Sequence, residues 1–228
     1  MTENVNLTSA LFGRLNALGG VDVFSPAKVQ SIELGTTTPD LDLSSWPTLT
    51  LSTGQTLTAR LLVGADGANS PVRTFAGIPS RGFDYSRHGV VASLKLAGPG
   101  WGGLDHKIAY QRFLPTGPLA MLPMPGNMAT LVWSTTPERA TKLKAISARD
   151  FVATVNAGFR LSSVDLEYLH DMESGQEEEV AWREQHTPTN ERELPMRVVE
   201  VQENSVASFP LRMRHADTYT GERVALVG

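Results

Sequence analysis

The stretch Leu61-Leu-Val-Gly-Ala-Asp-Gly-Ala-Asn-Ser-Pro-Val-Arg73 carries the most information about the fold of this chain. Its apolar start predicts a buried strand. Ser70 before Pro71 is typical of a helix N-terminus, with serine as the cap and proline at the first helical position. Open α/β sheets bind ligands where such strands end, at their carboxyl edge. Asp66 and Gly67 follow the predicted strand directly, so they are candidate ligand contacts.

The residue types around this turn suit an anionic or ribose-phosphate group. Gly67 permits a positive φ and a close approach of the backbone to a ligand. Arg73 brings a guanidinium beside the predicted helix N-terminus. The same residues also fit a tight turn with a capping serine and a solvated arginine, because glycine, aspartate and asparagine are common in turns without any ligand.

On either side of this turn, apolar periodicity predicts further elements. Leu7, Leu11, Leu15 and Leu18 recur at helical spacing and predict a helix over residues 1–18. Strands are predicted over 21–24, 28–34, 48–51, 57–63 and 223–228. Domains usually end in polar residues, whereas this chain starts on a helix and stops on an apolar strand. We therefore expect a fragment of a larger domain.

The middle of the chain has the pattern of an antiparallel sheet followed by helices. Strands are predicted over 90–96, 107–114, 119–122 and 128–134, separated by turns that contain glycine or proline. Helices are predicted over 137–145, 148–159 and 164–170, the second capped by Ser147. Residues 173–193 hold seven acidic residues and two arginines, which predicts a solvated loop or a frayed helix. Short strands are predicted over 198–201 and 206–209.

Composition excludes several classes of function. The chain has 228 residues, a formal net charge of −4 and no cysteine. The acidic balance disfavours nucleic-acid binding, and the lack of cysteine excludes disulfide scaffolds and thiol catalysis. No apolar run is long enough to span a bilayer. The five histidines are scattered, so we expect no metal site.

Four segments, taken in order, resemble one family. Gly64-Ala-Asp-Gly-Ala-Asn-Ser-Pro-Val-Arg73 resembles the DG motif of the FAD-dependent aromatic hydroxylases, the para-hydroxybenzoate hydroxylase group. Leu7-Thr-Ser-Ala-Leu11 is similar to the helix entering that family's flavin domain. The segment 111–123 with Leu131-Val-Trp-Ser134 resembles the central sheet of the ubiquinone-producing branch. Phe209-Pro-Leu211 with 223–228 resembles the approach to the family's GD motif. The family's GxGxxG turn is absent from this sequence.

The resemblance implies an incomplete fold of α/β plus α+β type. We expect part of a Rossmann-like FAD domain and an antiparallel-sheet substrate domain covered by helices. The implied boundaries are 1–79 for the partial FAD-binding domain, 80–210 for the substrate-binding domain and 211–228 for a strand returning to the FAD domain.

The resemblance also implies an activity. The complete protein would be an FAD-dependent monooxygenase that hydroxylates a polyprenylated 4-hydroxybenzoate-type phenol in ubiquinone biosynthesis, through a flavin hydroperoxide. Without the GxGxxG turn, this chain alone is expected to be inactive and not to retain FAD. A non-catalytic module that binds a lipid or a protein, and a related FAD epoxidase or reductase, are the alternatives.

The resemblance points to two sets of site residues, with no catalytic side chain and no metal ligand among them. The implied cofactor-binding residues are Asp66, Gly67, Ser70 and Arg73. The implied substrate-binding residues are Arg112, Phe113, Leu119, Met121 and Trp133. Strand alternation alone does not say which of the second set face a pocket and which pack against helices on the other side.

Partners and location follow from the same resemblance. Besides the prenylated phenol, it implies a ferredoxin-type electron donor and subunits of a ubiquinone-biosynthesis complex. It implies peripheral contact with a membrane, namely the matrix side of the mitochondrial inner membrane, with a targeting segment outside this chain. An acidic run at Glu177-Glu-Glu179 is a further candidate for docking a basic redox partner or an assembly subunit.

Overall fold

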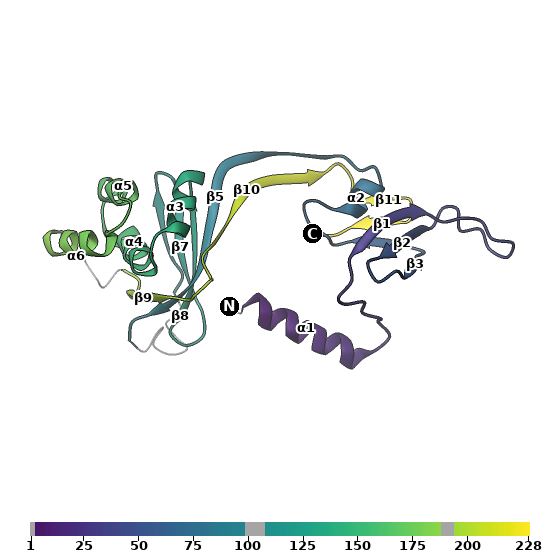
Figure 1. The fold of residues 1–228 in the computed structure, drawn as a ribbon, viewed down its shortest axis with the longest axis horizontal. Helices are drawn as coiled ribbons and strands as arrows, with labels where there is room; N and C mark the ends of the chain where they lie inside the picture. The colour runs from purple at the N-terminus through teal and green to yellow at the C-terminus, as the bar shows by residue number, and fades with distance from the viewer. Residues whose placement is uncertain (1–2, 99–107, 188–193) are drawn as a thin grey trace. The chain divides into compact units, whose positions relative to one another are not determined.

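The computed structural model of this chain describes residues 3–98, 108–187 and 194–228. The chain divides into two compact units (Figure 1). One consists of Met1–Phe12 and Asp84–Leu211, and the other of Gly13–Phe83 and Arg212–Gly228. Each unit therefore combines segments that are far apart in the sequence.

A six-stranded sheet is the centre of the unit that contains Asp84–Leu211. Its strands follow the order β10-β5-β8-β7-β6, and β9 pairs with β5. Neighbours along β5-β8-β7-β6 are antiparallel, as the turn spacing predicts. The strands are β5 (Ser80–Leu96), β6 (Tyr110–Leu114), β7 (Gly117–Pro123), β8 (Met128–Thr135), β9 (Val198–Val201) and β10 (Ala207–Ala216).

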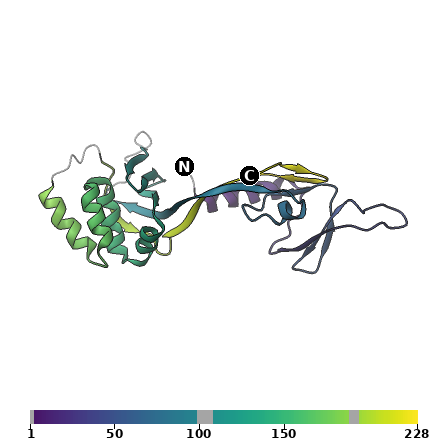
Figure 2. The ribbon, with the colours of Figure 1, turned by 90° about the horizontal axis from the view of Figure 1, so that it is seen from above.

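Helices cover one face of this sheet (Figures 1 and 2). They are α3 (Pro137–Ala145), α4 (Ala148–Arg160), α5 (Ser163–Asp171) and α6 (Gln176–His186). Thr136, Ser147 and Ser162 cap the first three by accepting a hydrogen bond from a backbone N–H in the first turn. The prediction of helices in this region, including the cap at Ser147, is confirmed.

Helix α4 is apolar on two sides and joins two cores. Phe151, Val155 and Phe159 pack against the buried side chains of the sheet. Ala157 and Leu161 pack instead against the apolar residues of α5 and α6. The sheet, α4, and the pair α5–α6 therefore form successive layers.

The unit that contains Gly13–Phe83 has two small sheets. An antiparallel meander joins β1 (Val29–Leu34), β2 (Pro47–Leu51) and β3 (Thr56–Thr58). The other sheet has the order β11-β12-β4, in which β12 (Val224–Leu226) pairs antiparallel with β11 (Thr220–Gly221) and parallel with β4 (Leu62–Gly64). Helix α2 (Pro71–Phe75) follows β4, and Val72 packs in a small core with Leu62 and Val224. The predicted strand-to-helix order is confirmed.

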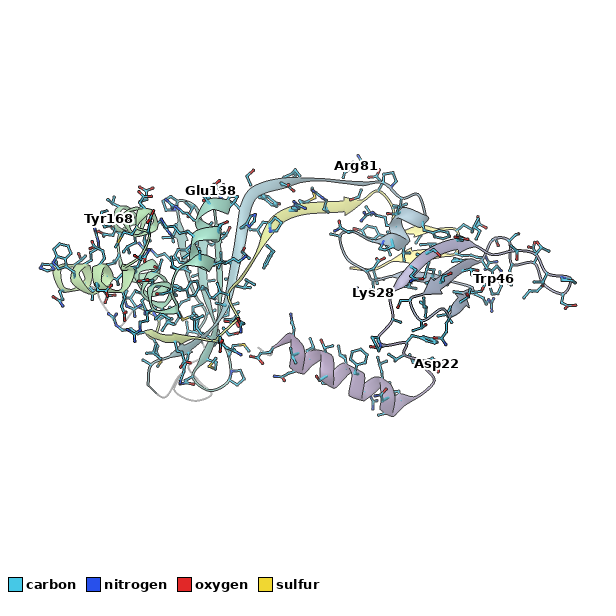
Figure 3. All side chains as sticks on the ribbon, in the orientation of Figure 1. Asp22, Lys28, Trp46, Arg81, Glu138 and Tyr168 are labelled. Atoms are coloured by element: carbon cyan, nitrogen blue, oxygen red, sulfur yellow. The ribbon has the colours of Figure 1, made fainter. Side chains whose placement is uncertain are left out.

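Arg223 joins these two sheets. Its side chain donates hydrogen bonds to the Ser45 hydroxyl at 3.1 Å and the Arg60 carbonyl at 3.2 Å. Its guanidinium carbon lies 5.0 Å from the centroid of the Trp46 ring, which Figure 3 labels. An arginine at the start of β12 thus holds the meander against the parallel strand pair.

The structure corrects several details of the sequence-based prediction. The strands predicted over 90–96 and 206–209 are the longer β5 and β10, and the strand predicted over 107–114 begins outside the described residues. The run 57–63 is not one strand but two: β3 pairs with β2, whereas β4 pairs with β12 in another sheet. Residues 21–24 form no strand. In the segment 173–193, residues 176–186 form the regular helix α6, whose acidic first turn suits the positive end of the helix dipole.

The helix predicted at the start of the chain is α1 (Asn4–Leu18), and none of its side chains is buried. Within the described residues, no helix is long and apolar enough to cross a membrane. The same part of the chain contains no group of three or more His, Asp or Glu side chains placed to hold a metal ion.

Candidate functional site

The turn after β4 lies at an edge where two strands end together. Because β4 and β12 are parallel and Leu226 lies opposite Gly64, their carboxyl ends reach the same side of the sheet. The backbone N–H of Val227 donates to the carbonyl of Gly64 at 2.9 Å and extends this pairing beyond the strands. Two segments more than 150 residues apart in the sequence are therefore neighbours at this edge.

Hydrogen bonds from the loop hold the turn against the N-terminus of α2. The Asp66 carboxylate accepts the backbone N–H of Val72 at 3.1 Å, and the Ser70 hydroxyl accepts that of Arg73 at 2.9 Å. Both N–H groups lie in the first turn of the helix, where no backbone carbonyl is available as a partner. The Arg73 guanidinium donates to the Ala68 carbonyl at 2.8 Å, which closes the loop from the other side.

These contacts also favour the charged form of Asp66. Partial burial acts in the opposite direction. The hydrogen bonds from Ser70 and Val72, with the nearby charge of Arg73, outweigh it and hold the pKa of Asp66 below its usual value. The carboxylate is therefore ionised at neutral pH and serves as an acceptor inside the loop.

Two glycines of the turn have different surroundings. A Cβ at Gly64 would lie 2.8 Å from the Cβ of Val72 and 3.0 Å from Cδ2 of Leu226, so β4, α2 and β12 meet there at close range. Gly67 has a φ of +82°, and a Cβ built on it would meet nothing within 4 Å. Gly67 thus offers an exposed backbone that a ligand can approach closely, which fits the role that the resemblance implies for it.

The four residues predicted to bind the cofactor are all brought together by this turn. Asp66 and Gly67 are exposed, Arg73 is half-buried and Ser70 is buried at 4% exposure. Their hydrogen bonds are those of a capped turn, and Asp66 and Gly67 remain exposed on its outer side. Contact between these residues and FAD stays a prediction.

Four of the five predicted substrate-binding residues lie on the sheet face that α4 covers. Arg112, Leu119 and Trp133 are cross-strand neighbours in one row, and Met121 occupies the next row. Leu119, Met121 and Trp133 are at most 1% exposed. A ligand could reach these three side chains only if the helical layer moved away. In this structure the three side chains therefore pack between the sheet and the helices.

Arg112 belongs to the same packed layer. Its guanidinium donates to the carbonyl of Gly158 in α4 at 2.9 Å, and burial lowers its pKa. Gly158 itself sits so close to the sheet that a Cβ there would lie 2.6 Å from Cδ2 of Leu119. In this structure Arg112 therefore ties β6 to α4.

Phe113 is the exception, because it lies on the opposite face of the sheet and is 79% exposed. That face, here called the open face, includes a cross-strand row of Val91, Val132, Ala120 and Gln111. Gly89 also lies on it, and a Cβ at Gly89 would come within 3.1 Å of Cζ of Phe209. Of the residues on this face, sequence reasoning selected only Phe113 as a site candidate, because strand alternation groups residues by face without saying which face the helices cover.

Comparison with known proteins shows which family the chain is similar to. Residues 3–228 match the FAD binding domain family, which is nearly the whole chain. The chain belongs to this family. The ubiquinone biosynthesis monooxygenase COQ6, mitochondrial, of Saccharomyces cerevisiae is 39% identical over 251 residues, covering 100% of this chain and 50% of the yeast protein. The human COQ6 protein is 36% identical over 190 residues, covering 83% of this chain and 40% of the human protein.

The resemblance read from the sequence is thus confirmed, both for the family and for its ubiquinone branch. The COQ6 proteins of Saccharomyces cerevisiae and Schizosaccharomyces pombe match this chain over its whole length, and the chain spans about half the length of each of them. FAD is the cofactor that the family and its relatives support.

Solved structures confirm the fold class. CmlS, a flavin-dependent halogenase, aligns with a TM-score of 0.57 at 15% identity over 98% of this chain and 34% of CmlS. OxyS, an anhydrotetracycline hydroxylase from Streptomyces rimosus, aligns with a TM-score of 0.54 at 17% identity over 100% of this chain and 36% of OxyS. The mixed α/β architecture is that of the FAD-dependent hydroxylase fold.

Proposed function

We propose that this chain supplies part of the flavin site and the substrate-facing sheet of an FAD-dependent monooxygenase that acts in ubiquinone biosynthesis. The observation that carries the proposal is the parallel pairing of β4 with β12, which brings the Asp66–Gly67 turn and Val227 to one edge. Open α/β sheets bind cofactors at such an edge. Identity of 39% to COQ6 proteins supports the reaction class.

The residues of the turn after β4 have different roles in this proposal. Gly67 offers the exposed backbone against which FAD would lie, since a Cβ there would meet no atom within 4 Å. Asp66 and Ser70 are positioning residues, because their side chains hold the first turn of α2. FAD supplies the oxygen-activating chemistry when it is bound; the protein fixes where that chemistry happens.

The open face is our proposed floor of the substrate pocket. Its central row of Val91, Val132 and Ala120 is small and apolar, and Gln111 at the end of the row supplies a polar group. Phe113 and Phe209 stand beside this row and add aromatic surface. A flat apolar floor with few polar groups suits a polyprenylated phenol. We assign the unit with Asp84–Leu211 to the substrate and the other unit to FAD.

The proposed reaction replaces a ring C–H bond with C–OH. One atom of dioxygen enters the ring carbon ortho to the phenol hydroxyl, and the other leaves as water after taking up two electrons and two protons. A ferredoxin-type protein is the proposed electron donor. We place the complete protein at the matrix side of the mitochondrial inner membrane, in contact with other ubiquinone-biosynthesis proteins. The names of the mitochondrial COQ6 relatives support the organelle.

The test is an assay of the complete protein with FAD, reduced ferredoxin and a 4-hydroxybenzoate that carries a short prenyl chain. In ¹⁸O-labelled dioxygen we expect a product with one labelled oxygen on the ring. An unlabelled product, or a labelled epoxide on the prenyl chain, would contradict the proposal and favour another flavoprotein reaction. FAD binding without any turnover of prenylated phenols would favour a binding module.

A further inference from the structure

Helices α5 and α6 present an outward face that no other described segment of their unit covers (Figure 3). Three large side chains on it are exposed: Val164 at 76%, Tyr168 at 51% and Trp182 at 55%. Val164 and Tyr168 are four residues apart on α5 and share one side of that helix. Trp182 lies on α6, which packs beside α5. Exposed aromatic side chains of this size are typical of protein interfaces.

The charge around these side chains is strongly one-sided. Residues 163–187 contain eight acidic residues and one arginine, a formal charge of −7, whereas the other 203 residues carry +3. The net acidity of the protein is therefore concentrated in these two helices. Solubility requires a net charge but not its concentration in one region. The concentration of negative charge in these helices, while the rest of the chain is positive, therefore needs another explanation.

Half of these eight carboxylates remain available to a partner, since Glu167 and Glu184 pair with Arg139 and Arg197 outside the two helices. Arg183 is neutralised locally by Asp165 and Glu179. Within the part of the chain that the structure describes, no ion pair involves Asp171, Glu173, Glu177 or Glu178, and all four are exposed. The helix dipole accounts for the position of Glu177 and Glu178 in the first turn of α6. It does not account for the acidic residues Asp171 and Glu173, which precede that helix, or for the exposure of Tyr168 and Trp182.

Both aromatic side chains are in contact with a neighbouring charged or aromatic group. The Arg183 guanidinium carbon lies 4.6 Å from the centroid of the Tyr168 ring, so the charge cluster holds that ring in place. The Trp182 and His186 rings lie 4.4 Å apart by their centroids. Ordered aromatic side chains lose little conformational entropy on binding and are frequent anchors at interfaces.

We propose that the exposed surface of α5, α6 and the loop between them, here called the acidic–aromatic face (Val164, Tyr168, Asp171, Glu173, Glu177, Glu178 and Trp182), docks a basic, amphipathic helix of a partner protein. The partner's lysines and arginines pair with the carboxylates, and its apolar side chains cover Trp182 and Tyr168. The face lies on the side of α4 away from the sheet, so docking there leaves the open face accessible. The inference does not rest on the proposed function.

The experiment uses the complete protein and a fluorescently labelled amphipathic Lys/Leu peptide, with the matching Glu/Leu peptide as a probe of opposite charge. Binding is followed by fluorescence anisotropy at several salt concentrations. We expect the basic peptide to bind and the acidic peptide not to bind. The double variant Trp182→Ala/Tyr168→Ala should lose about tenfold or more in affinity, since such anchors dominate interface energies.

Two charge variants distinguish binding at this face from a nonspecific attraction of the basic peptide to an acidic protein. Glu173→Gln/Glu177→Gln/Glu178→Gln removes three carboxylates from the face, whereas Glu33→Gln/Asp40→Asn/Glu203→Gln removes three exposed carboxylates elsewhere. We expect only the first triple variant to weaken binding and to flatten its salt dependence. Equal effects of the two triples, or no effect of the aromatic variant in a protein with unchanged circular dichroism, would overturn the proposal.

A crosslinking experiment tests the competing occupants. A photo-reactive phenylalanine analogue at position 182 should crosslink the bound Lys/Leu peptide in the complete protein. A crosslink to a second copy of the chain would instead make the face a self-association surface. Binding of the wild type, but not of Trp182→Ala/Tyr168→Ala, to phosphatidylcholine–cardiolipin vesicles would make it a membrane contact. Either result would overturn the proposal.

Discussion

The carboxylate of Asp66 accepts the backbone N–H of Val72, 3.1 Å away, and thereby fixes the exposed loop to the first turn of α2. The loop that we assign to FAD therefore owes its shape to a side chain within it. Under our proposal Asp66 influences FAD binding only through the shape of this loop, so we expect the structural and binding effects of its substitution to be coupled.

Replacing Asp66 by alanine should lower the free energy of unfolding by about 1 kcal/mol at neutral pH, the usual cost of losing a helix cap. Because the folded pKa of this carboxyl group is lowered, its stabilisation is present above the unfolded pKa and lost as pH falls through the folded value. The wild type and Asp66→Ala should therefore converge in stability in acid. Urea unfolding at several pH values measures this, with Asp40→Ala as an exposed control; a gap that is constant with pH would contradict it.

Gly64→Ala should destabilise the protein by about 1–3 kcal/mol, because the new methyl group has no room between Val72 and Leu226. Gly13→Ala places the same methyl group on an exposed helix where nothing lies within 4 Å. That control should be neutral or slightly stabilising, since alanine favours helices. Thermal unfolding of both variants compares them directly, and equal melting temperatures would refute the close contact.

Leu119→Ala and Phe113→Ala should separate stability from substrate binding. Leu119 is fully buried under α4, so its truncation should cost about 3 kcal/mol of unfolding free energy. Phe113 is largely exposed, and its truncation should leave stability within about 0.5 kcal/mol while raising the KM for a prenylated phenol. Denaturant titration and steady-state kinetics test the pair; a KM for Phe113→Ala equal to the wild-type value would remove Phe113 from the proposed pocket.

His170 should make the stability of its unit depend on pH in mild acid. Burial, followed by the charges of Arg139 and Lys142, lowers the pKa of His170 from 6.5 to about 4. Between these values the unfolded chain binds the additional proton, so stability falls by up to about 3 kcal/mol as pH decreases from 6.5 to 4. His170→Leu should lose this part of the pH dependence, whereas substitution of the exposed His186 should not. Identical profiles for the wild type and His170→Leu would contradict the assignment.

The sequence predicted the elements and caps well because these depend on local residue types. Ser70 with Pro71, and Ser147 before its helix, carry their signal within four residues. The split of 57–63 into β3 and β4 was not predictable, since it depends on pairing with β12 more than 150 residues later. The burial of Leu119 and Trp133 was not predictable for a similar reason. Strand alternation shows which residues share a face of the sheet, but only the position of α4 decides which face is buried.

The most direct test of the account is FAD binding by two glycine variants of the complete protein. Gly67 and Gly54 share a φ of +82°, and a Cβ at either would meet nothing within 4 Å, so alanine imposes the same backbone strain at both. Only Gly67 lies in the loop assigned to the flavin. Titration of the apoprotein with FAD, followed by flavin fluorescence, should show about tenfold weaker binding for Gly67→Ala, about 1.4 kcal/mol, and unchanged binding for Gly54→Ala. Equal FAD affinities for the two variants would contradict the assignment of this turn to the cofactor.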